Sequence, residues 1–93
     1  MLKQSYISGL GFNVPDKVMK NEDLSEFMDT SDEWIYERSG IKERRVVNHH
    51  ESDGVGPCDL AIPAVEEALV MANLKKEDID FIIFSTAMPD YFL

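Results

Sequence analysis

Trp34 and Arg38 lie four residues apart in a short segment with a helical pattern, so their side chains share one helix face. A flat indole beside a guanidinium suits an adenine nucleotide, because the purine stacks on the ring while the cation meets a phosphate. Thr30 lies at the start of the same segment, where a hydroxyl and free backbone N–H groups favour anions. A second interpretation stays open: Trp34 anchors a core and Arg38 stacks over it at the surface.

Cys58 is the single cysteine, and it precedes a predicted helix whose dipole lowers a thiol pKa. His49 and His50 are near in sequence, so a nucleophile with a base is one interpretation. A lone cysteine at a helix start is more often a small packed residue, so we assign no catalytic residue. His49 and His50 are adjacent, and with Asp53 they do not give a third ligand at the spacing typical of metal sites. We therefore expect a solvated loop and no metal site.

The charge of the chain limits its partners. The 93 residues include 18 acidic and 9 basic side chains, which give a formal net charge of −9. Such a field repels nucleic acid and anionic membranes, and we expect neither as a partner. One local cluster of basic residues could attract phosphate or carboxylate: Arg38, Lys42, Arg44 and Arg45. With one cysteine, no leader pattern and no apolar run near the roughly 20 residues that span a bilayer, we expect a cytoplasmic protein.

Local patterns predict the elements that position these residues. Residues 6–11 read as a short strand, and Asn, Pro and Asp in 13–16 favour a turn. Asn21 reads as the cap of a helix with acidic residues in its first turn. Thr30 as N-cap and Glu33 three residues later form the pattern of a capping box, and this helix should end near Gly40.

The second half of the chain also divides into predicted strands, a helix and the segments that connect them. Residues 41–47 favour a strand, and the polar residues 48–56 favour a loop. A helix is predicted over 59–73 from its broad apolar stripe, with Pro63 tolerable only within the first turn. Residues 74–80 form a charged link. The apolar strand 81–85 should be buried on both faces, as in the centre of a layered α/β sheet.

Three runs of residues share a family pattern: Asn21-Glu22-Asp23-Leu24, Asp29-Thr30-Ser31-Asp32-Glu33-Trp34-Ile35, and Arg38-Ser39-Gly40-Ile41-Lys42-Glu43-Arg44-Arg45. Together with the Gly9-to-Pro15 and Ser85-to-Leu93 stretches, they resemble the N-terminal region of β-ketoacyl-acyl-carrier-protein synthase III. The resemblance covers nearly all 93 residues. The second run followed by Arg-x-Gly-Ile is quite specific to this family and its near relatives.

The resemblance implies a thiolase-like α/β fold with two similar halves, each with a mixed sheet, layered α-β-α-β-α. Residues 1–93 would be the start of the first half, an incomplete domain. In the family, acyl-CoA acylates an active-site Cys, and the acyl group condenses with malonyl carrier protein, with loss of carbon dioxide and without a covalently bound cofactor. The implied partners are acyl-CoA, acyl carrier protein, the remainder of the chain and a second copy in a homodimer. Cys58 does not match the nucleophile's motif.

Four residues match family positions. Trp34 resembles the tryptophan that stacks on the CoA adenine, Arg38 the arginine near the CoA phosphates, and Thr30 the threonine beside the adenine. Leu93 resembles the position that reaches the acyl pocket of the neighbouring subunit at the dimer interface. The long 48–58 loop and Pro63 depart from the family pattern. The acyl primer stays open, and so does a different class of function, a non-catalytic fragment that acts only by packing or dimerisation.

Overall fold

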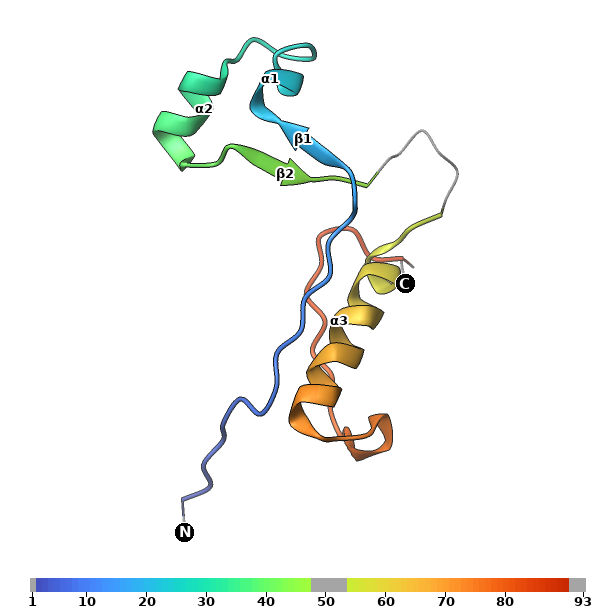
Figure 1. Cartoon of the computed structure of the whole chain (residues 1–93). Coiled ribbons are helices and arrows are strands. Elements are labelled where there is room, and N and C mark those ends of the chain that lie inside the picture. The colour runs from blue at the N-terminus through green and yellow to red at the C-terminus, as the bar shows by residue number, and fades with distance from the viewer. Residues whose placement is uncertain (1, 48–53, 91–93) are drawn as a thin grey trace. The chain divides into compact units, whose positions relative to one another are not determined.

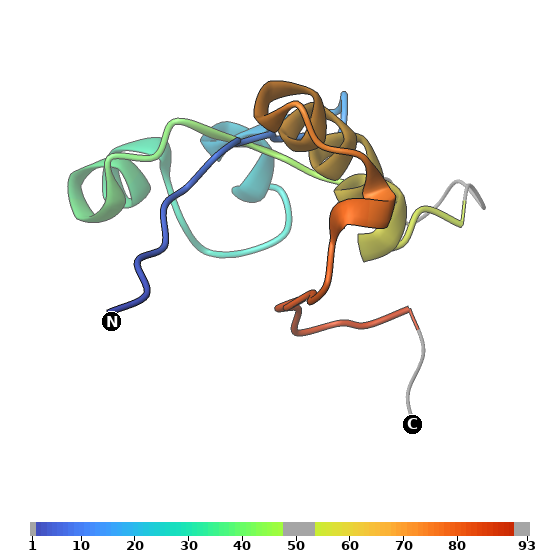
Figure 2. The same cartoon turned by 90° about the horizontal axis from the view of Figure 1, so that it is seen from below.

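A computed structural model describes residues 2–47 and 54–90 (Figure 1). The chain divides into two units, one formed by Val14–Asp53 and the other by Met1–Asn13 with Gly54–Leu93. Figure 2 turns the same cartoon by 90°. No helix in the described ranges has the length and apolar character needed to cross a membrane.

The first unit is built on a two-stranded antiparallel sheet. Strand β1 (Val18–Lys20) pairs with β2 (Glu43–Arg45), so that Val18 lies opposite Arg45 and Lys20 opposite Glu43. Residues 41–47 were predicted as a strand, and β2 confirms the centre of that range. Strand β1 was not predicted, since three residues are too few to show a periodic pattern.

Two short helices connect these strands, α1 (Asn21–Leu24) and α2 (Asp32–Ser39). The prediction that Asn21 caps α1 is wrong, because Lys20 is the N-cap and its N–H donates to the Asp23 carboxylate at 2.7 Å. The predicted end of α2 is confirmed: Gly40 adopts the left-handed conformation with φ 69°, which glycine tolerates without strain.

The predicted cap of α2 is also wrong by one residue. Ser31, not Thr30, is the N-cap, and its hydroxyl oxygen accepts a hydrogen bond from the Trp34 N–H at 3.1 Å. The helix therefore begins at Asp32, and Glu33 falls one position too early to complete a capping box.

The second unit contains the long helix α3 (Pro57–Ala72) and the 3-10 turn η1 (Lys76–Asp78). The predicted helix over 59–73 is confirmed with a slightly earlier start. Pro63, however, lies inside the helix and not in its first turn, where Pro57 stands. Pro63 cannot donate to the carbonyl of Asp59, and both residues are exposed, so solvent can hydrate that carbonyl.

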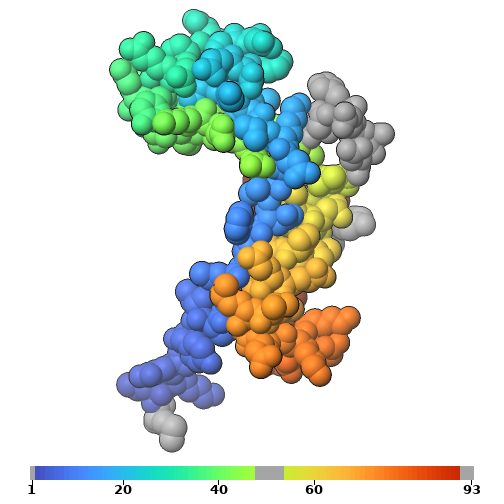
Figure 3. All heavy atoms as spheres, viewed as in Figure 1, coloured from blue at the N-terminus to red at the C-terminus, as the bar shows by residue number. Residues whose placement is uncertain are grey.

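Within the second unit, residues 9–13 run along α3 (Figure 1), and the space-filling view shows the two segments in contact (Figure 3). The predicted strand over 6–11 is nevertheless not formed. A strand exists only where a second strand satisfies its backbone groups, and no other described segment pairs with these residues. What holds the segment is close packing of Gly9 and Gly11 against the helix backbone.

The predicted buried strand over 81–85 is wrong for the same reason. Residues 81–85 have no regular secondary structure, and Phe81 and Ile83 are 80% and 85% exposed. Burial on both faces requires a layer on each side of the strand, and the described residues supply no such pair of layers. No apolar side chain in the described ranges is fully buried. The single buried residue there is polar, Asn21.

Candidate functional site

Helix α2 presents Trp34 and Arg38 on one face, as their spacing predicts. The Arg38 guanidinium carbon lies 4.2 Å from the centroid of the Trp34 ring, which is a cation–π contact. Trp34 is 54% exposed. The indole is thus not a core anchor in this structure, and both side chains can be reached by a ligand from solvent.

Thr30 precedes the helix without taking part in its cap. Its hydroxyl oxygen is covered and has no hydrogen-bond partner in the part of the chain that the structure describes. The residue as a whole is half-buried. A ligand would therefore reach this hydroxyl only after the side chain rotates.

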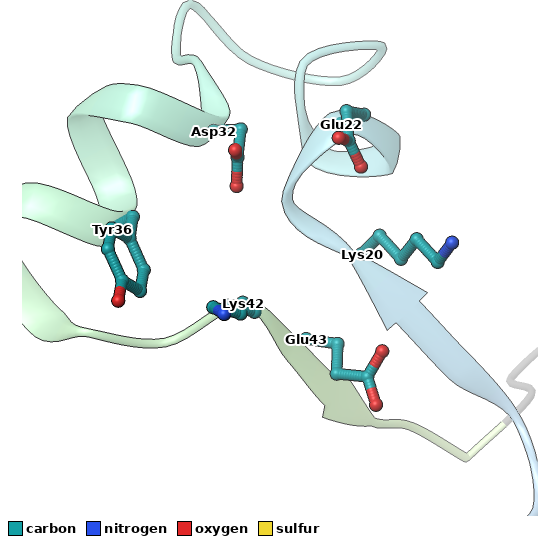
Figure 4. Close-up of a pocket in the computed structure, with 6 residues that line it drawn as sticks. All are labelled: Lys20, Glu22, Asp32, Tyr36, Lys42 and Glu43. Atoms are coloured by element: carbon teal, nitrogen blue, oxygen red, sulfur yellow. The ribbon is translucent and has the colours of Figure 1, made fainter.

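The opposite side of α2 borders a cavity of about 450 Å³ in the first unit (Figure 4). Asp32 and Tyr36 face it, and they stand two residues before Trp34 and Arg38, hence about 200° around the helix from them. The Lys42 ammonium lies 5.4 Å from the centroid of the Tyr36 ring. The lining of the cavity includes neither Trp34 nor Arg38, and it does not include Thr30, which precedes the helix. Its lining is Lys20, Glu22, Asp32, Tyr36, Lys42 and Glu43.

The predicted cluster of basic residues does not converge on one anion site. Arg38 stacks on Trp34, and Lys42 lies over Tyr36. Arg44 donates to the Asn21 side chain, while Arg45 donates to the Pro15 carbonyl at 3.1 Å. Successive residues of a strand point to opposite faces of the sheet, so the side chains of Arg44 and Arg45 in β2 point away from each other. The prediction of a single positive spot is wrong.

A polar network that the sequence did not reveal holds α2 at its first residue. The Asn21 amide nitrogen donates to the Asp32 carboxylate at 2.8 Å and to the Ile41 carbonyl at 2.7 Å. The Asn21 amide oxygen accepts a hydrogen bond from Arg44. The sequence pattern predicts a helix cap at Asn21, so the role of its side chain in linking Asp32, Ile41 and Arg44 was not predicted.

Cys58 lies at the second position of α3, opposite a carboxylate. Its backbone N–H donates to the Asp90 carboxylate at 3.0 Å. A hydrogen bond to Asp90, desolvation and the negative charges of Asp90 and Asp59 raise the pKa of the Cys58 thiol. A raised pKa disfavours the thiolate, which is the nucleophilic form of cysteine.

Other predicted residues fall outside the structural description. Leu93, His49, His50 and Asp53 lie outside the described residues. Within residues 2–47 and 54–90, no group of three or more His, Cys, Asp or Glu side chains could hold a metal ion.

Comparisons with known proteins agree on one class. No family profile matches the chain. β-Ketoacyl-[acyl-carrier-protein] synthase III of Campylobacter jejuni subsp. doylei is 46% identical over 92 residues, which are 99% of this chain and 27% of that protein. The synthase III of Symbiobacterium thermophilum is 46% identical over 84 residues, which are 90% of this chain and 24% of that protein. The chain thus spans about a quarter of the length of these curated relatives.

Solved structures show the same likeness. The crystal structure of 3-oxoacyl-[acyl-carrier-protein] synthase III from Aquifex aeolicus matches with a TM-score of 0.69 and 43% identity, over 80% of this chain and 22% of that one. The enzyme from Pseudomonas aeruginosa matches with a TM-score of 0.60 and 37% identity, over 72% of this chain and 20% of that one.

The likeness to these solved structures defines the chain as a segment of a thiolase-like α/β protein, and the predicted fold class is confirmed. More particularly, nearly all of this chain is similar to about a quarter of β-ketoacyl-[acyl-carrier-protein] synthase III, so the resemblance predicted from the sequence is confirmed over the segment that the chain spans.

Proposed function

We propose that this chain is the N-terminal part of a condensing acyltransferase of fatty acid biosynthesis. The enzyme takes an acyl group from acyl-CoA onto a cysteine outside these 93 residues and condenses it with malonyl carrier protein. It needs no covalently bound cofactor. It works in the cytoplasm as a homodimer, with acyl-CoA and acyl carrier protein as partners. Similarity to synthase III relatives over 99% of the chain supports this proposal.

The observation on which the proposal depends is the exposed Trp34–Arg38 stack on α2. Arg38 covers one face of the indole, so the adenine of CoA stacks on the other face or displaces the guanidinium. The Arg38 cation stays next to the purine and can pair with a CoA phosphate. Thr30 contributes a hydroxyl beside the adenine once its side chain rotates. Leu93 belongs to the acyl pocket of the neighbouring subunit.

Substitution in the full-length enzyme tests the assignment. Trp34→Ala and Arg38→Ala should each weaken acyl-CoA binding by about 1–3 kcal/mol. A loss of about 1.4 kcal/mol raises the Kd about tenfold. An acyl-pantetheine substrate lacks the nucleotide end, so its KM should not change in either variant. Unchanged acyl-CoA affinity in both variants would defeat the CoA assignment.

A second candidate is a non-catalytic fragment that acts by packing or dimerisation. The exposure of residues 81–84, which runs from 51% to 85%, favours this alternative. The intact mass of the purified protein, with a search for a companion chain, separates it from the enzyme. A cooperative, monomeric species of 93 residues would contradict it.

A further inference from the structure

Asn21 is the buried residue in the described part of the first unit, which is unusual because its side chain is polar. It is 0% exposed, while no apolar side chain in the described ranges is fully buried. Burying an amide is unfavourable unless its hydrogen bonds are made. Such a residue therefore has a role that an apolar side chain of the same size could not fill.

The hydrogen bonds of Asn21 join three elements. From α1, its amide nitrogen reaches Asp32, the first residue of α2, and the Ile41 carbonyl just before β2. From β2, Arg44 donates to the Asn21 oxygen and also to the Met19 carbonyl at 3.4 Å. The neutral amide thus lies between a carboxylate that it donates to and a guanidinium that donates to it. Exchanging the positions of the amide oxygen and nitrogen of Asn21 would break both contacts.

Apolar packing does little to orient α2. Ile35 is half-buried, and every other residue of the helix is exposed. A helix without an apolar stripe is not fixed by core packing. The bond between Asn21 and Asp32 is therefore a principal constraint on the N-terminal end of α2. Trp34 stands two residues after Asp32, and Arg38 stands six residues after it.

We propose that Asn21 is a positioning residue for the nucleotide end of the CoA ligand. Through Asp32 it fixes the first turn of α2, and thereby the direction in which Trp34 and Arg38 face the ligand. This inference rests on the proposed function, because it takes the α2 pair as the nucleotide contact. Asn21 itself touches neither substrate nor reacting atoms.

Two substitutions in the full-length enzyme test the inference. Asn21→Ala removes the whole network, and Asp32→Ala removes only the link to α2. Each should raise the KM for acyl-CoA about tenfold or more, the size expected for one lost hydrogen bond to a charged group, with kcat little changed. The KM for acyl-pantetheine should stay at the wild-type value, since that substrate has no nucleotide to orient.

Two control variants separate this link from other effects. Asp32→Asn keeps an oxygen that can accept from Asn21, so it should restore the wild-type KM for acyl-CoA. Glu33→Ala removes a neighbouring first-turn charge without touching Asn21, so it reports the helix-dipole effect alone. In a Trp34→Ala/Arg38→Ala double-variant background, Asp32→Ala should add nothing further, because it acts through these two side chains.

The outcomes are distinguishable. Equal KM changes for acyl-CoA and acyl-pantetheine overturn the inference, as does an Asp32→Ala effect that persists when both Trp34 and Arg38 have been replaced by alanine. Loss of folding in both alanine variants while Asp32→Asn folds also overturns it, since the role would then be general stability. If Trp34→Ala leaves acyl-CoA binding unchanged, the proposed function fails. If Trp34→Ala weakens binding while Asn21→Ala and Asp32→Ala do not, this inference alone fails.

Discussion

Gly11 lies so close to the backbone of Ala64 in α3 that no side chain fits between them. A Cβ added at Gly11 would overlap the Ala64 carbonyl oxygen and lie 2.9 Å from the Ala68 nitrogen. Gly9 makes the same approach one turn further along the helix, where its added Cβ would lie 3.0 Å from the Ala72 nitrogen. Small residues on both partners therefore hold an extended segment on a helix without any strand pairing.

Gly11→Ala should destabilise the protein. The new methyl group meets helix backbone, which cannot move aside as a flexible side chain can, so the cost is about 1–3 kcal/mol. The measurement is the free energy of unfolding of the full-length protein in denaturant. Gly40→Ala is the matched control, because nothing lies within 4 Å of its added Cβ and only the positive φ of 69° is strained. A larger loss at Gly40 than at Gly11 would contradict the packing argument.

Ser31→Ala should cost about 1 kcal/mol of stability, because it removes the hydroxyl that accepts from the Trp34 N–H. Thr30→Val is the paired test, since it removes the covered hydroxyl that has no hydrogen-bond partner in the described ranges and keeps the shape of the side chain. It should be neutral or slightly stabilising. Thermal unfolding of both variants provides the comparison. The reverse order of effects would restore Thr30 as the cap of α2.

Cys58 should react slowly with alkylating reagents at neutral pH. Its pKa is raised, so the neutral thiol persists above the ordinary cysteine value of about 8.5. The contribution of this group to stability is fully present below that ordinary value. It is lost as the pH rises through the raised pKa, because the native state then binds more protons than the unfolded state.

Asp90→Asn should lower the pH at which Cys58 becomes reactive, because it removes the nearest negative charge and keeps a side chain that can accept from the Cys58 N–H. The measurement is the alkylation rate of the Cys58 peptide across a pH series, read by mass spectrometry. Asp59→Asn is the control, since Asp59 is the weaker cause of the shift. An unchanged midpoint in Asp90→Asn would show that Asp90 does not set the thiol pKa.

The 93-residue chain by itself should not unfold cooperatively. Its described residues contain no fully buried apolar side chain, so little hydrophobic free energy opposes the conformational entropy of the chain. Exposed apolar residues such as Phe81 and Ile83 should bind a hydrophobic dye. Calorimetry and dye fluorescence on the isolated chain check both expectations, and a sharp transition without dye binding would contradict them.

Features that depend on nearby residues were predictable from the sequence. Gly40 ends α2 because only a residue that tolerates positive φ fits there, and the small and apolar residues that recur every three or four positions along α3 mark its packing face. The spacing of Trp34 and Arg38 placed them on one face for the same local reason. Helix geometry repeats every few residues, so these features need no information from distant parts of the chain.

Features that depend on distant contacts were decided only in three dimensions. Asn21 reads locally as a cap, but its partners Ile41 and Arg44 are 20 and 23 residues away, and they convert it into a buried link. Residues 6–11 and 81–85 have strand-forming composition but form no strand. A strand needs hydrogen bonds from a second segment, and composition alone cannot show whether that segment is present. Backbone pairing and polar burial join residues far apart in sequence, so tertiary structure alone could assign them.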